Sequence, residues 1–439
     1  MSEERETDEM KPATGRARNA IGSVLALIGA CLIIFAFLWY LLGVKRLVVF
    51  PAGIDHTIQS HGTVTKLTGT HGLYTLVPPL KAPVGLVGKL SSLDADYRAN
   101  VAEVQETVDN TEPAPFGLDL SEQNTYVLNR HDCENLKSGD STTDGEIIDR
   151  SGSWYVNFPL GTKKESRNIF NNDVGSAFAV KYRGTGKVNG VGVYIFEGTM
   201  GHRPILDYRA RAMGLPATTT FGALKAELAQ QGVPIDAMVA AASGSLTPVE
   251  RATFEQFPES REVRLTYSEK AEWKAAVEPV TGTIVKLHRL RRSIYVNTDL
   301  GTFQPLLGIL ANHSEDPLVE KYLSQVDQQK LQDPKELYRV EYGWNDATVR
   351  QMTDFAGKRI SPMRFVKDWM MTTMLLIGAA LVVTGLVMRK KEHLREEGED
   401  DHLLPRIIHR DKGGDTAVED ASGTGGEPPG GRGDGGEAR

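Results

Sequence analysis

Residues 177–196 read AFAVKYRGTGKVNGVGVYIF, and this run carries the clearest structural signal in the chain. Apolar and polar side chains alternate in its second half, which is typical of a strand with one buried face. Asn189 and Gly190 lie in the middle, and an Asn-Gly pair is the usual two-residue turn of an antiparallel hairpin. The run therefore predicts two antiparallel strands joined by a tight turn.

Other segments resemble this one, and they extend the prediction to most of the chain. Short apolar or aromatic-rich runs separated by Gly, Asn and Asp are typical of strands. They occur at residues 126–128, 154–158, 177–182, 191–196, 263–267, 284–287 and 293–296. We predict an α+β fold, in which a β-rich antiparallel domain carries a helical insert and is flanked by two transmembrane helices.

Helical patterns interrupt the strands. Thr247 precedes Pro248 and is followed by Glu250 at the third helical position, which predicts a capping box at the start of a helix. The insert, at about 215–259, is one of the helical regions. The predicted helices are residues 220–231, 235–242, 248–257, 317–331 and 345–356.

Two apolar runs are long enough to cross a bilayer. Residues 19–44 carry no charged side chain, and at about 1.5 Å per residue a helix of this length exceeds the roughly 30 Å hydrocarbon core. A cleaved signal peptide is the alternative, but its apolar region is about 7–15 residues long. Residues 369–388 form the second run, for which a buried core helix is the alternative. We predict transmembrane helices at 19–44 and 367–388, with a domain at 45–366 between them.

The flanking charges predict the orientation of both spans. Lys11, Arg16 and Arg18 precede the first span, and the cluster 389–391 (Arg-Lys-Lys) directly follows the second. Positive residues close to a span favour the cytoplasmic side, whereas long loops cross largely regardless of charge. We therefore expect a two-pass plasma-membrane protein with both termini in the cytoplasm and the main domain outside.

Small residues recur on one face of each apolar run. Gly22, Ala26 and Ala30 are spaced four apart, and residues 378–385 include a comparable set. Such a face lets another helix backbone approach closely. The two spans would then pack on each other or on a partner membrane protein; alternatively, small residues are simply common in membrane helices.

Both tails have the composition of disordered segments. Residues 1–18 are short and charged, and residues 389–439 are rich in acids and glycine. Neither contains enough apolar side chains to form a core. The tails hold most of the formal net charge of -7, so the chain between them is nearly neutral. This excludes the basic surface that nucleic-acid binding requires.

A search for reactive groups finds no recognised constellation. The sequence has no nucleophile elbow, zinc-binding His-Glu-x-x-His pair or phosphate-binding loop. His131, Asp132, Cys133 and Glu134 are consecutive, but neighbouring positions point in different directions and predict a polar loop rather than a metal site. Cys31 lies in an apolar run and Cys133 does not, so the two do not pair. We expect no catalytic residue, no cofactor and no metal ligand.

Two regions resemble a known family. Residues 148–160 with 182–196, and residues 273–282 (WKAAVEPVTG), are similar to the central segment and the Val-Glu-Pro-x-Thr-Gly signature of the actinobacterial porin-PorA-like family, long catalogued as a domain of unknown function. The resemblance covers nearly all of residues 20–388, although the insert is longer than in the family pattern. The motif residues are Asp149, Arg150, Gly152, Phe158, Pro159, Tyr182, Gly190, Tyr194, Phe196, Glu278, Pro279, Thr281 and Gly282.

Each motif also has a purely structural explanation. Asp149 and Arg150 would form a charge pair that closes a turn, and residues 279–282 would form a hairpin turn with a positive φ at Gly282. A lone carboxylate such as Glu278 is weak evidence for acid–base chemistry. We therefore interpret these residues as structural.

The resemblance implies a non-enzymatic protein of the actinobacterial cell envelope that binds or helps traffic envelope lipids or lipoglycans. A scaffold that recruits envelope-biogenesis machinery is the alternative, and an envelope hydrolase or transferase is a more distant one. The family name implies a pore, but a transmembrane β-barrel does not need two apolar helices. The segments 72–88 and 303–310 are candidates to line a lipid groove, unless they are ordinary core. The candidate lining residues are Leu73, Leu76, Leu80 and Leu86.

Overall fold

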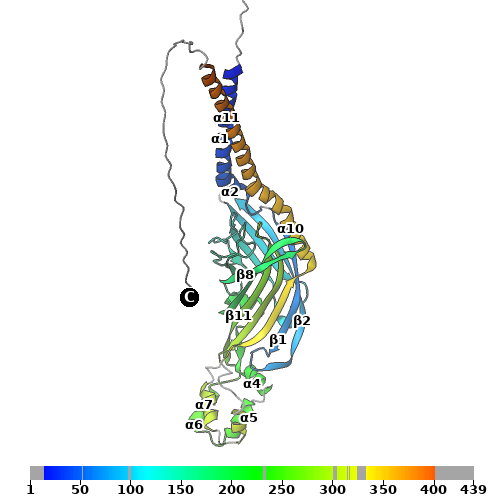
Figure 1. Cartoon of the computed structure of the whole chain (residues 1–439). Helices are drawn as coiled ribbons and strands as arrows, with labels where there is room; N and C mark the ends of the chain where they lie inside the picture. Colours follow the sequence, from blue (N-terminus) through cyan, green and yellow to red (C-terminus); the bar gives the residue numbers. More distant parts are fainter. Residues whose placement is uncertain are drawn as a thin grey trace, which may run out of the picture. The chain divides into compact units, whose positions relative to one another are not determined.

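The computed structural model describes residues 14–400 except 52, 97–99, 231–233, 300–303, 314, 316 and 324–332. Its centre is a thirteen-stranded antiparallel sheet, which confirms the predicted α+β fold (Figure 1). The strands are β1 (Asp55–Thr68), β2 (Thr75–Asp96), β3 (Val101–Asn110), β4 (Glu122–Asn129), β5 (Thr142–Thr143), β6 (Glu146–Ile147), β7 (Arg167–Asn171), β8 (Ser176–Val188), β9 (Val191–Pro204), β10 (Thr218–Thr220), β11 (Glu262–Val277), β12 (Ile284–Thr298) and β13 (Lys335–Trp344).

Helices precede, follow and interrupt the strands. The chain starts with α1 (Thr14–Leu38), η1 (Trp39–Gly43) and α2 (Val44–Leu47), and the described part ends with α10 (Asp346–Arg364), η4 (Phe365–Trp369) and α11 (Met370–Asp400). Between the strands lie η2 (Pro115–Gly117), α3 (Asp207–Ala212), α4 (Phe221–Gln230), α5 (Ile235–Ala242), α6 (Pro248–Glu255), α7 (Gln304–Asn312) and α8 (Pro317–Leu323).

The strands follow the order β6-β5-β4-β3-β2-β1-β13-β12-β11-β9-β8-β7, and β10 pairs with β11. Most neighbours are also neighbours in the sequence, as expected for a series of hairpins. The exceptions are β9 with β11, and the central pair of β1 and β13, where Val64 lies opposite Val340. The first and last strands of the domain are therefore side by side in the middle of the sheet.

The hairpin predicted from residues 177–196 forms as β8 and β9. Val188 lies opposite Val191, and Asn189 and Gly190 between them have φ values of 47° and 84°. Two consecutive positive φ values define the turn that matches the twist of antiparallel strands, and Asn and Gly adopt them most readily. The prediction is confirmed.

Two parts of the strand prediction differ from the structure. Residues 154–158 are not a strand, because only Trp154 forms a single bridge, to Ile169. The long strands β1, β2 and β3 were not predicted, because their repeated Thr, Ser, Gly and Lys residues weaken the apolar pattern. Burial alternates in the first half of β3 nonetheless, and β1 follows the pattern of a strand with one covered face.

The two ends of the strand order are linked through irregular segments. Leu128 of β4 bridges to Asn135, whose backbone amide donates to the Ser153 carbonyl at 2.9 Å. Next to it, the Trp154 amide donates to the Asn168 carbonyl at 2.9 Å, at the start of β7. These bonds cover sheet edges that would otherwise expose unpaired backbone groups.

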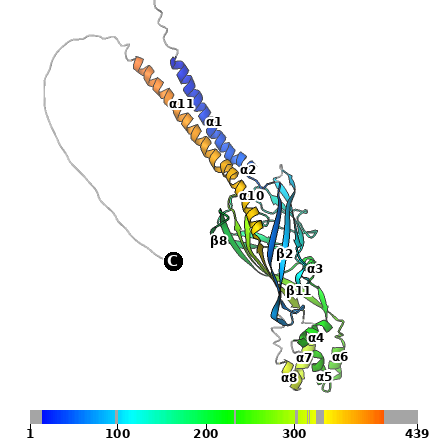
Figure 2. The same cartoon turned by 90° about the vertical axis from the view of Figure 1, so that its right-hand side faces the viewer.

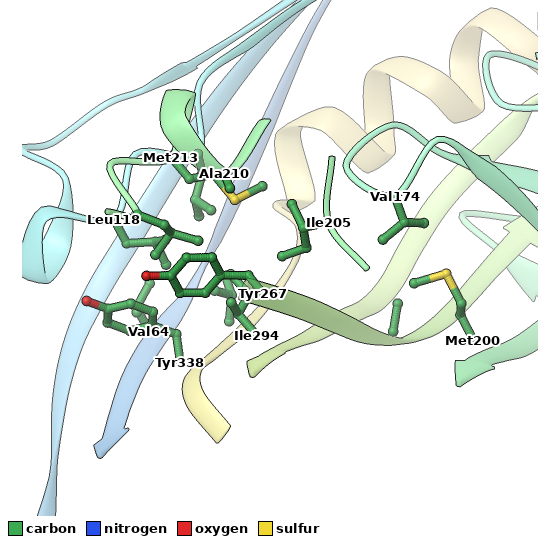
Figure 3. Close-up of a cluster of buried hydrophobic side chains, with 14 of the residues drawn as sticks. Val64, Leu118, Val174, Met200, Ile205, Ala210, Met213, Tyr267, Ile294 and Tyr338 are labelled. Carbon is green, nitrogen blue, oxygen red and sulfur yellow. The ribbon is translucent and has the colours of Figure 1, made fainter. Parts of the chain in front are cut away.

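The main core lies on the inner face of the curved sheet. Figure 3 shows Tyr267, Ile294 and Tyr338 from three neighbouring strands, with Met213 and Leu118 packed over them. All five side chains are buried. Burying such side chains contributes about 1.5–3 kcal/mol each, so this layer fixes the curvature of the sheet around it.

The helical insert forms where it was expected. α5 has the predicted bounds, and α6 begins with the predicted capping box, in which Thr247 accepts from the Glu250 amide and Glu250 accepts from the Thr247 amide. Figures 1 and 2 show α4 to α7 gathered at one end of the sheet. Buried Met238, Leu310 and Val319 join the insert to α7 and α8 in a small core of its own.

Two helices in the described part are long and apolar enough to cross a membrane. They cover residues Ala20–Gly43 and Asp346–Lys391, in agreement with the two predicted runs. A Cβ added at Gly22 would lie 2.9 Å from the Gly385 carbonyl oxygen, and one at Gly378 would lie 2.9 Å from that of Gly29. The small-residue faces therefore pack on each other, which is the first of the alternatives that the sequence left open.

The predicted tails are only partly within the described residues. α11 continues to Asp400, so residues 389–400 are helical and not disordered as predicted. Glu, Lys, Arg and Leu dominate this stretch, and all are good helix formers. Residues 1–13 and 401–439 lie outside the described residues, as does Phe303.

Candidate functional site

The two family motifs meet in the structure. The Phe158 amide donates to the Gly282 carbonyl at 2.8 Å, and the Gly161 amide donates to the Val280 carbonyl at 3.0 Å. Asn157 adds a side-chain bond to the Thr281 carbonyl at 2.9 Å. The segment around Phe158 is thereby fixed to the turn between β11 and β12.

That turn has the predicted form. Glu278 accepts hydrogen bonds from the Val280 amide at 3.0 Å, the Thr281 amide at 2.7 Å and the Thr281 hydroxyl at 2.8 Å. Gly282 has a φ of 69°, and a Cβ there would overlap the Phe158 carbonyl. Glu278 thus holds the turn together, and only glycine fits the position of Gly282.

Arg150 has a different environment from the one predicted. Asp149 accepts from the Ser151 amide at 3.0 Å and forms no ion pair with Arg150, so the predicted charge pair is wrong. Arg150 is instead fully buried, and its guanidinium donates to the Thr125 and Thr142 carbonyls at 3.0 Å each. A buried guanidinium has five N–H groups to satisfy, and an adjacent carboxylate on the surface cannot follow it inward.

The partners of Arg150 come from both ends of the strand order. Asn124 on β4 accepts from Nη2 at 3.2 Å, Asn172 beyond β7 accepts from Nε at 3.1 Å, and the guanidinium carbon lies 4.6 Å from the centre of the Tyr126 ring. Arg150 therefore links the same two ends that the backbone segments link.

The aromatic motif residues lie together beside this segment. The ring of Phe158 lies 4.9 Å from that of Phe196 and is stacked at 6.1 Å on Trp273. Tyr182 contacts both Tyr194 and Phe196 edge to face. Such pairs add about 0.5–1.5 kcal/mol beyond the area they bury. The motif residues that contact one another are thus part of the packing, and Gly152 and Gly190 occupy turns with positive φ.

The sheet lines a partly open cavity of about 180 Å³. Its apolar lining comes from strands around the sheet, from the segment after Trp154 and from α10. These residues are Ile58, Leu86, Gly88, Leu90, Val108, Leu120, Val156, Ile169, Phe170, Phe178, Ala271, Trp273, Ile284, Leu287, Leu290 and Met352.

Polar side chains line the rest of the cavity. They are Ser60, Glu106, Glu122, Tyr155, Asn171, Asn172, Asp173, Arg292, Tyr342 and Trp344. The wall therefore combines a large apolar part with a cluster of charged groups, which suits a molecule with an apolar and a polar end.

Arg292 is at the centre of the charged cluster. It donates to Glu269 at 2.7 Å and is also paired with Asp173. Burial opposes its charge, but the carboxylates of Asp173 and Glu269 raise the pKa of Arg292 well above its ordinary value. Asn171 donates to Glu269 at 2.9 Å. Arg292 is therefore a fixed cation on the cavity wall, with its charge compensated.

A second buried arginine extends the cluster. Arg209 donates to Asp173 at 2.8 Å, is paired with Asp144 and lies 3.5 Å from Glu122. Burial, together with the nearby carboxylates of Asp173 and Glu106, raises the pKa of Glu122 to about 8, although Arg209 and Arg292 act in the opposite direction. Glu122 is therefore mostly protonated at neutral pH and can donate a hydrogen bond.

Glu106 occupies another part of the wall. It accepts from the Tyr126 hydroxyl at 2.7 Å and from Asn124 at 3.2 Å. Burial raises its pKa as well, against the effect of these bonds. The wall of the cavity thus carries the paired side chains of Arg292 and Asp173, together with two carboxyl groups, Glu106 and Glu122, that hold protons more tightly than usual.

The predicted lining residues have different positions. Leu86 lines the cavity, whereas Leu73 is buried against α4 with Phe221 and Leu224. Leu76 is half-buried and Leu80 is 47 % exposed on the part of β2 that pairs only with β1. The structure therefore does not bring the four leucines together.

The loop at His131 contains no metal site in the described part of the chain. Cys133 is buried, and burial raises the pKa of its thiol to about 12. Asn157 donates to its sulfur at 3.4 Å. Cys133 is therefore an inert core thiol rather than a reactive one.

The charged cluster was not predicted from the sequence. In β11, Glu269 is in phase with the buried positions Val263, Leu265, Tyr267 and Ala271. A carboxylate at an inward position of an alternating strand needs a buried partner. The inward position of Glu269 was therefore the feature of the sequence that indicates a buried charged cluster. The partner, Arg292 on β12, could not be identified without the pairing of the two strands.

The two apolar helices that precede and follow the sheet in the sequence are those of a membrane protein, and the sheet of this protein carries an amphipathic cavity. The chain belongs to the Porin PorA family, which it matches over residues 21–387. No curated protein matches the sequence.

Proposed function

We propose that the internal cavity binds the acyl chain of an envelope lipid or lipoglycan, and that the protein is a non-enzymatic lipid-binding or trafficking component of an actinobacterial plasma membrane. The observation that carries the proposal is the apolar wall of the cavity, which is lined by the sheet and contains a compensated charge cluster. The end of an acyl chain would contact this apolar wall, and Arg292 and Glu122 belong to the polar part of the same cavity.

The size of the cavity limits what it holds. A dry apolar cavity of about 150 Å³ accommodates benzene, so about 180 Å³ has room for the end of an acyl chain rather than for a whole lipid. Both termini would be cytoplasmic and the sheet domain outside, which follows from the flanking charges. A domain tethered at both ends would then stay next to the lipids of its own bilayer.

The cavity can be filled by substitution at Gly88. A Cβ there would meet only Ile58 at 3.6 Å, which is an ordinary contact. The side chain of Gly88→Leu should therefore fill part of the cavity without a backbone clash. Gly184→Leu is the matched control, because Gly184 is also a strand glycine, has no atom within 4 Å of an added Cβ and does not line the cavity.

The full-length protein, purified in detergent, would be extracted with organic solvent and the lipids identified by mass spectrometry. We expect lipid with wild type and Gly184→Leu and much less with Gly88→Leu. Shortening an added acyl chain should weaken binding about fourfold per methylene, at roughly 0.8 kcal/mol each. Equal lipid in all three proteins would refute the proposal.

A second candidate function has one observation in its favour. Glu122 is held protonated while Asp173, which also lines the cavity, pairs with two arginines. A carboxyl group with a raised pKa close to a second carboxyl group is a usual arrangement for acid–base hydrolysis. If wild type released a cleaved lipid product and Glu122→Gln did not, the protein would be an envelope hydrolase or transferase. A scaffold would retain membrane partners without lipid in the cavity.

A further inference from the structure

A second hollow lies outside the cavity, between the β8–β9 hairpin and α10. Its volume is about 470 Å³. We call it the juxtamembrane groove. It is lined by Thr185, Gly186, Gly190, Val191, Gly192, Val193, Tyr194, Glu278, Pro279, Gly357, Ile360, Ser361 and Arg364.

The hairpin is fixed against α10 at this place. Asn189 donates to the Thr353 hydroxyl at 3.3 Å, and Val193, Ala276 and Ala356 are buried together. The groove is therefore bounded by two elements that contact each other. Adding a Cβ at Gly192 or Gly357 would meet no atom within 4 Å, so the missing side chains leave open space rather than room for neighbours.

The groove lies next to the start of the second apolar helix. Arg364 is the last residue of α10, and the chain continues through η4 into α11. At 1.5 Å per residue, Arg364 is about 7.5 Å along the axis from the exposed Trp369. Tryptophan favours the membrane interface, and the polar layer of a bilayer leaflet is roughly 5–8 Å thick. This places Arg364 at the depth of lipid headgroups.

The charges at the groove are mainly positive. Within the described residues, Arg364 and Lys367 form no ion pair, and both are exposed. Lys164 lies 5.5 Å from the centre of the Tyr194 ring, which lines the groove. Lys367 Nζ lies 3.4 Å from the position of a Cβ at Gly161. These cations are available to a ligand.

Two carboxylates are close to these cations. Glu278 lines the groove, but it is 1 % exposed and its oxygens accept hydrogen bonds inside the turn. Asp368 is exposed on η4 and forms no ion pair in the described part of the chain. Among the residues that line the groove, Arg364 is the exposed charged side chain and Glu278 is buried, so an anion is favoured here.

We propose that the juxtamembrane groove binds the phosphate headgroup of an anionic phospholipid from the adjacent leaflet. Arg364 donates to the phosphate oxygens, which match the planar fork of a guanidinium, and the hydroxyls of Thr185 and Ser361 lie along the same groove. Because Gly186 and Gly192 have no side chains, the headgroup reaches the hairpin backbone. The bilayer is the source of the ligand, since the groove adjoins the helix that enters it.

The test uses the full-length protein in detergent micelles, with native mass spectrometry to count retained lipids. The probes are phosphatidylglycerol and diacylglycerol with the same acyl chains. Arg364→Gln removes the groove cation, and Lys358→Gln, an exposed cation on the same helix that does not line the groove, is the matched control. Gly192→Leu fills the groove without removing a charge.

We expect wild type and Lys358→Gln to retain phosphatidylglycerol better than diacylglycerol. Arg364→Gln should weaken phosphatidylglycerol retention about fivefold, the effect of one cation at a membrane surface, and Gly192→Leu should weaken it at least as much. Gly88→Leu, which fills the internal cavity, should leave it unchanged. Lipid that is lost only with Gly88→Leu is therefore bound in the internal cavity. Lipid that is lost with Arg364→Gln is bound in the juxtamembrane groove.

Several outcomes would overturn the proposal. Equal retention of the two lipids would show that the groove does not recognise phosphate. Equal effects of Arg364→Gln and Lys358→Gln on retention would show the same. Displacement of phosphatidylglycerol by inorganic phosphate would assign the groove to free phosphate. A lipid-independent dimer that Gly192→Leu disrupts would assign it to a second copy of the chain.

Discussion

The carbonyl of Gly282 accepts a hydrogen bond from the amide of Phe158 at 2.8 Å, across 124 positions of sequence. This bond joins the segment that links the two ends of the sheet to the turn between β11 and β12. Since the φ of Gly282 is 69°, the contact depends on a glycine at that position.

Replacing Gly282 with Ala should destabilise the protein strongly. The positive φ alone costs about 1–2 kcal/mol for a residue with a Cβ, and overlap with the Phe158 carbonyl adds to it. Gly152→Ala is the control, because Gly152 has a φ of 75° but no atom within 4 Å of an added Cβ. Thermal unfolding of both variants measures the difference. Equal melting temperatures would contradict the role assigned to the contact.

Arg150→Gln should also destabilise the fold. The substitution leaves the Thr125 and Thr142 carbonyls without their donors, and each unsatisfied buried group costs about 1–3 kcal/mol. Arg183→Gln, which removes an exposed cation from β8, should change the free energy of unfolding by less than about 0.5 kcal/mol. Denaturant titration compares the two. If Arg150→Gln lowered the free energy of unfolding as little as Arg183→Gln, Arg150 would not link the two ends of the sheet.

Glu122 should make stability dependent on pH. Its pKa is raised from 4.5 to about 8 in the folded state. The folded protein therefore holds a proton that the unfolded chain loses, so between about pH 4.5 and 8 this group lowers stability as the pH rises. Glu122→Gln removes the effect. The difference in melting temperature between this variant and wild type should therefore shift in favour of the variant as the pH rises over this range. A difference that stays constant with pH would contradict the raised pKa.

The topology prediction can be checked by cysteine labelling on intact cells. Cys31 would first be replaced with Ser, and Cys133 is buried, so the background is low. A cysteine at Gly139, which is exposed and has open space around it, should react with a membrane-impermeant maleimide. One at Gly425 should react only after the membrane is opened. The reverse pattern would place the sheet domain in the cytoplasm.

Local signals in the sequence were sufficient for local structure. The Asn189-Gly190 turn, the capping box at Thr247 and the two apolar runs each depend on residues close together in the chain. Their geometry follows from backbone conformation, side-chain caps and helix length. The prediction was therefore accurate where the physics involves a few neighbouring residues.

The cavity could not be predicted in the same way. Its charge cluster joins Glu122 on β4, Asp173 after β7 and Arg292 on β12, and only the pairing of all strands brings these residues together. Arg150 was expected to pair with Asp149 in a turn, yet its guanidinium donates to partners in the interior. Leu80 was proposed as lining but is on an exposed strand. Hydrophobicity indicates burial in general and not the side of a sheet that lines a cavity.

The pairing of β1 with β13 has a consequence for biosynthesis. β1 is made first and its central neighbour last, with residues 69–334 between them. Synthesis proceeds at about 5–20 residues per second. One edge of β1 therefore stays unpaired for roughly tens of seconds while the rest of the domain is synthesised. A chain that stopped between Thr298 and Lys335 would contain two half-sheets, and the edges of β1 and β12 that normally pair with β13 would be open, which favours aggregation over folding.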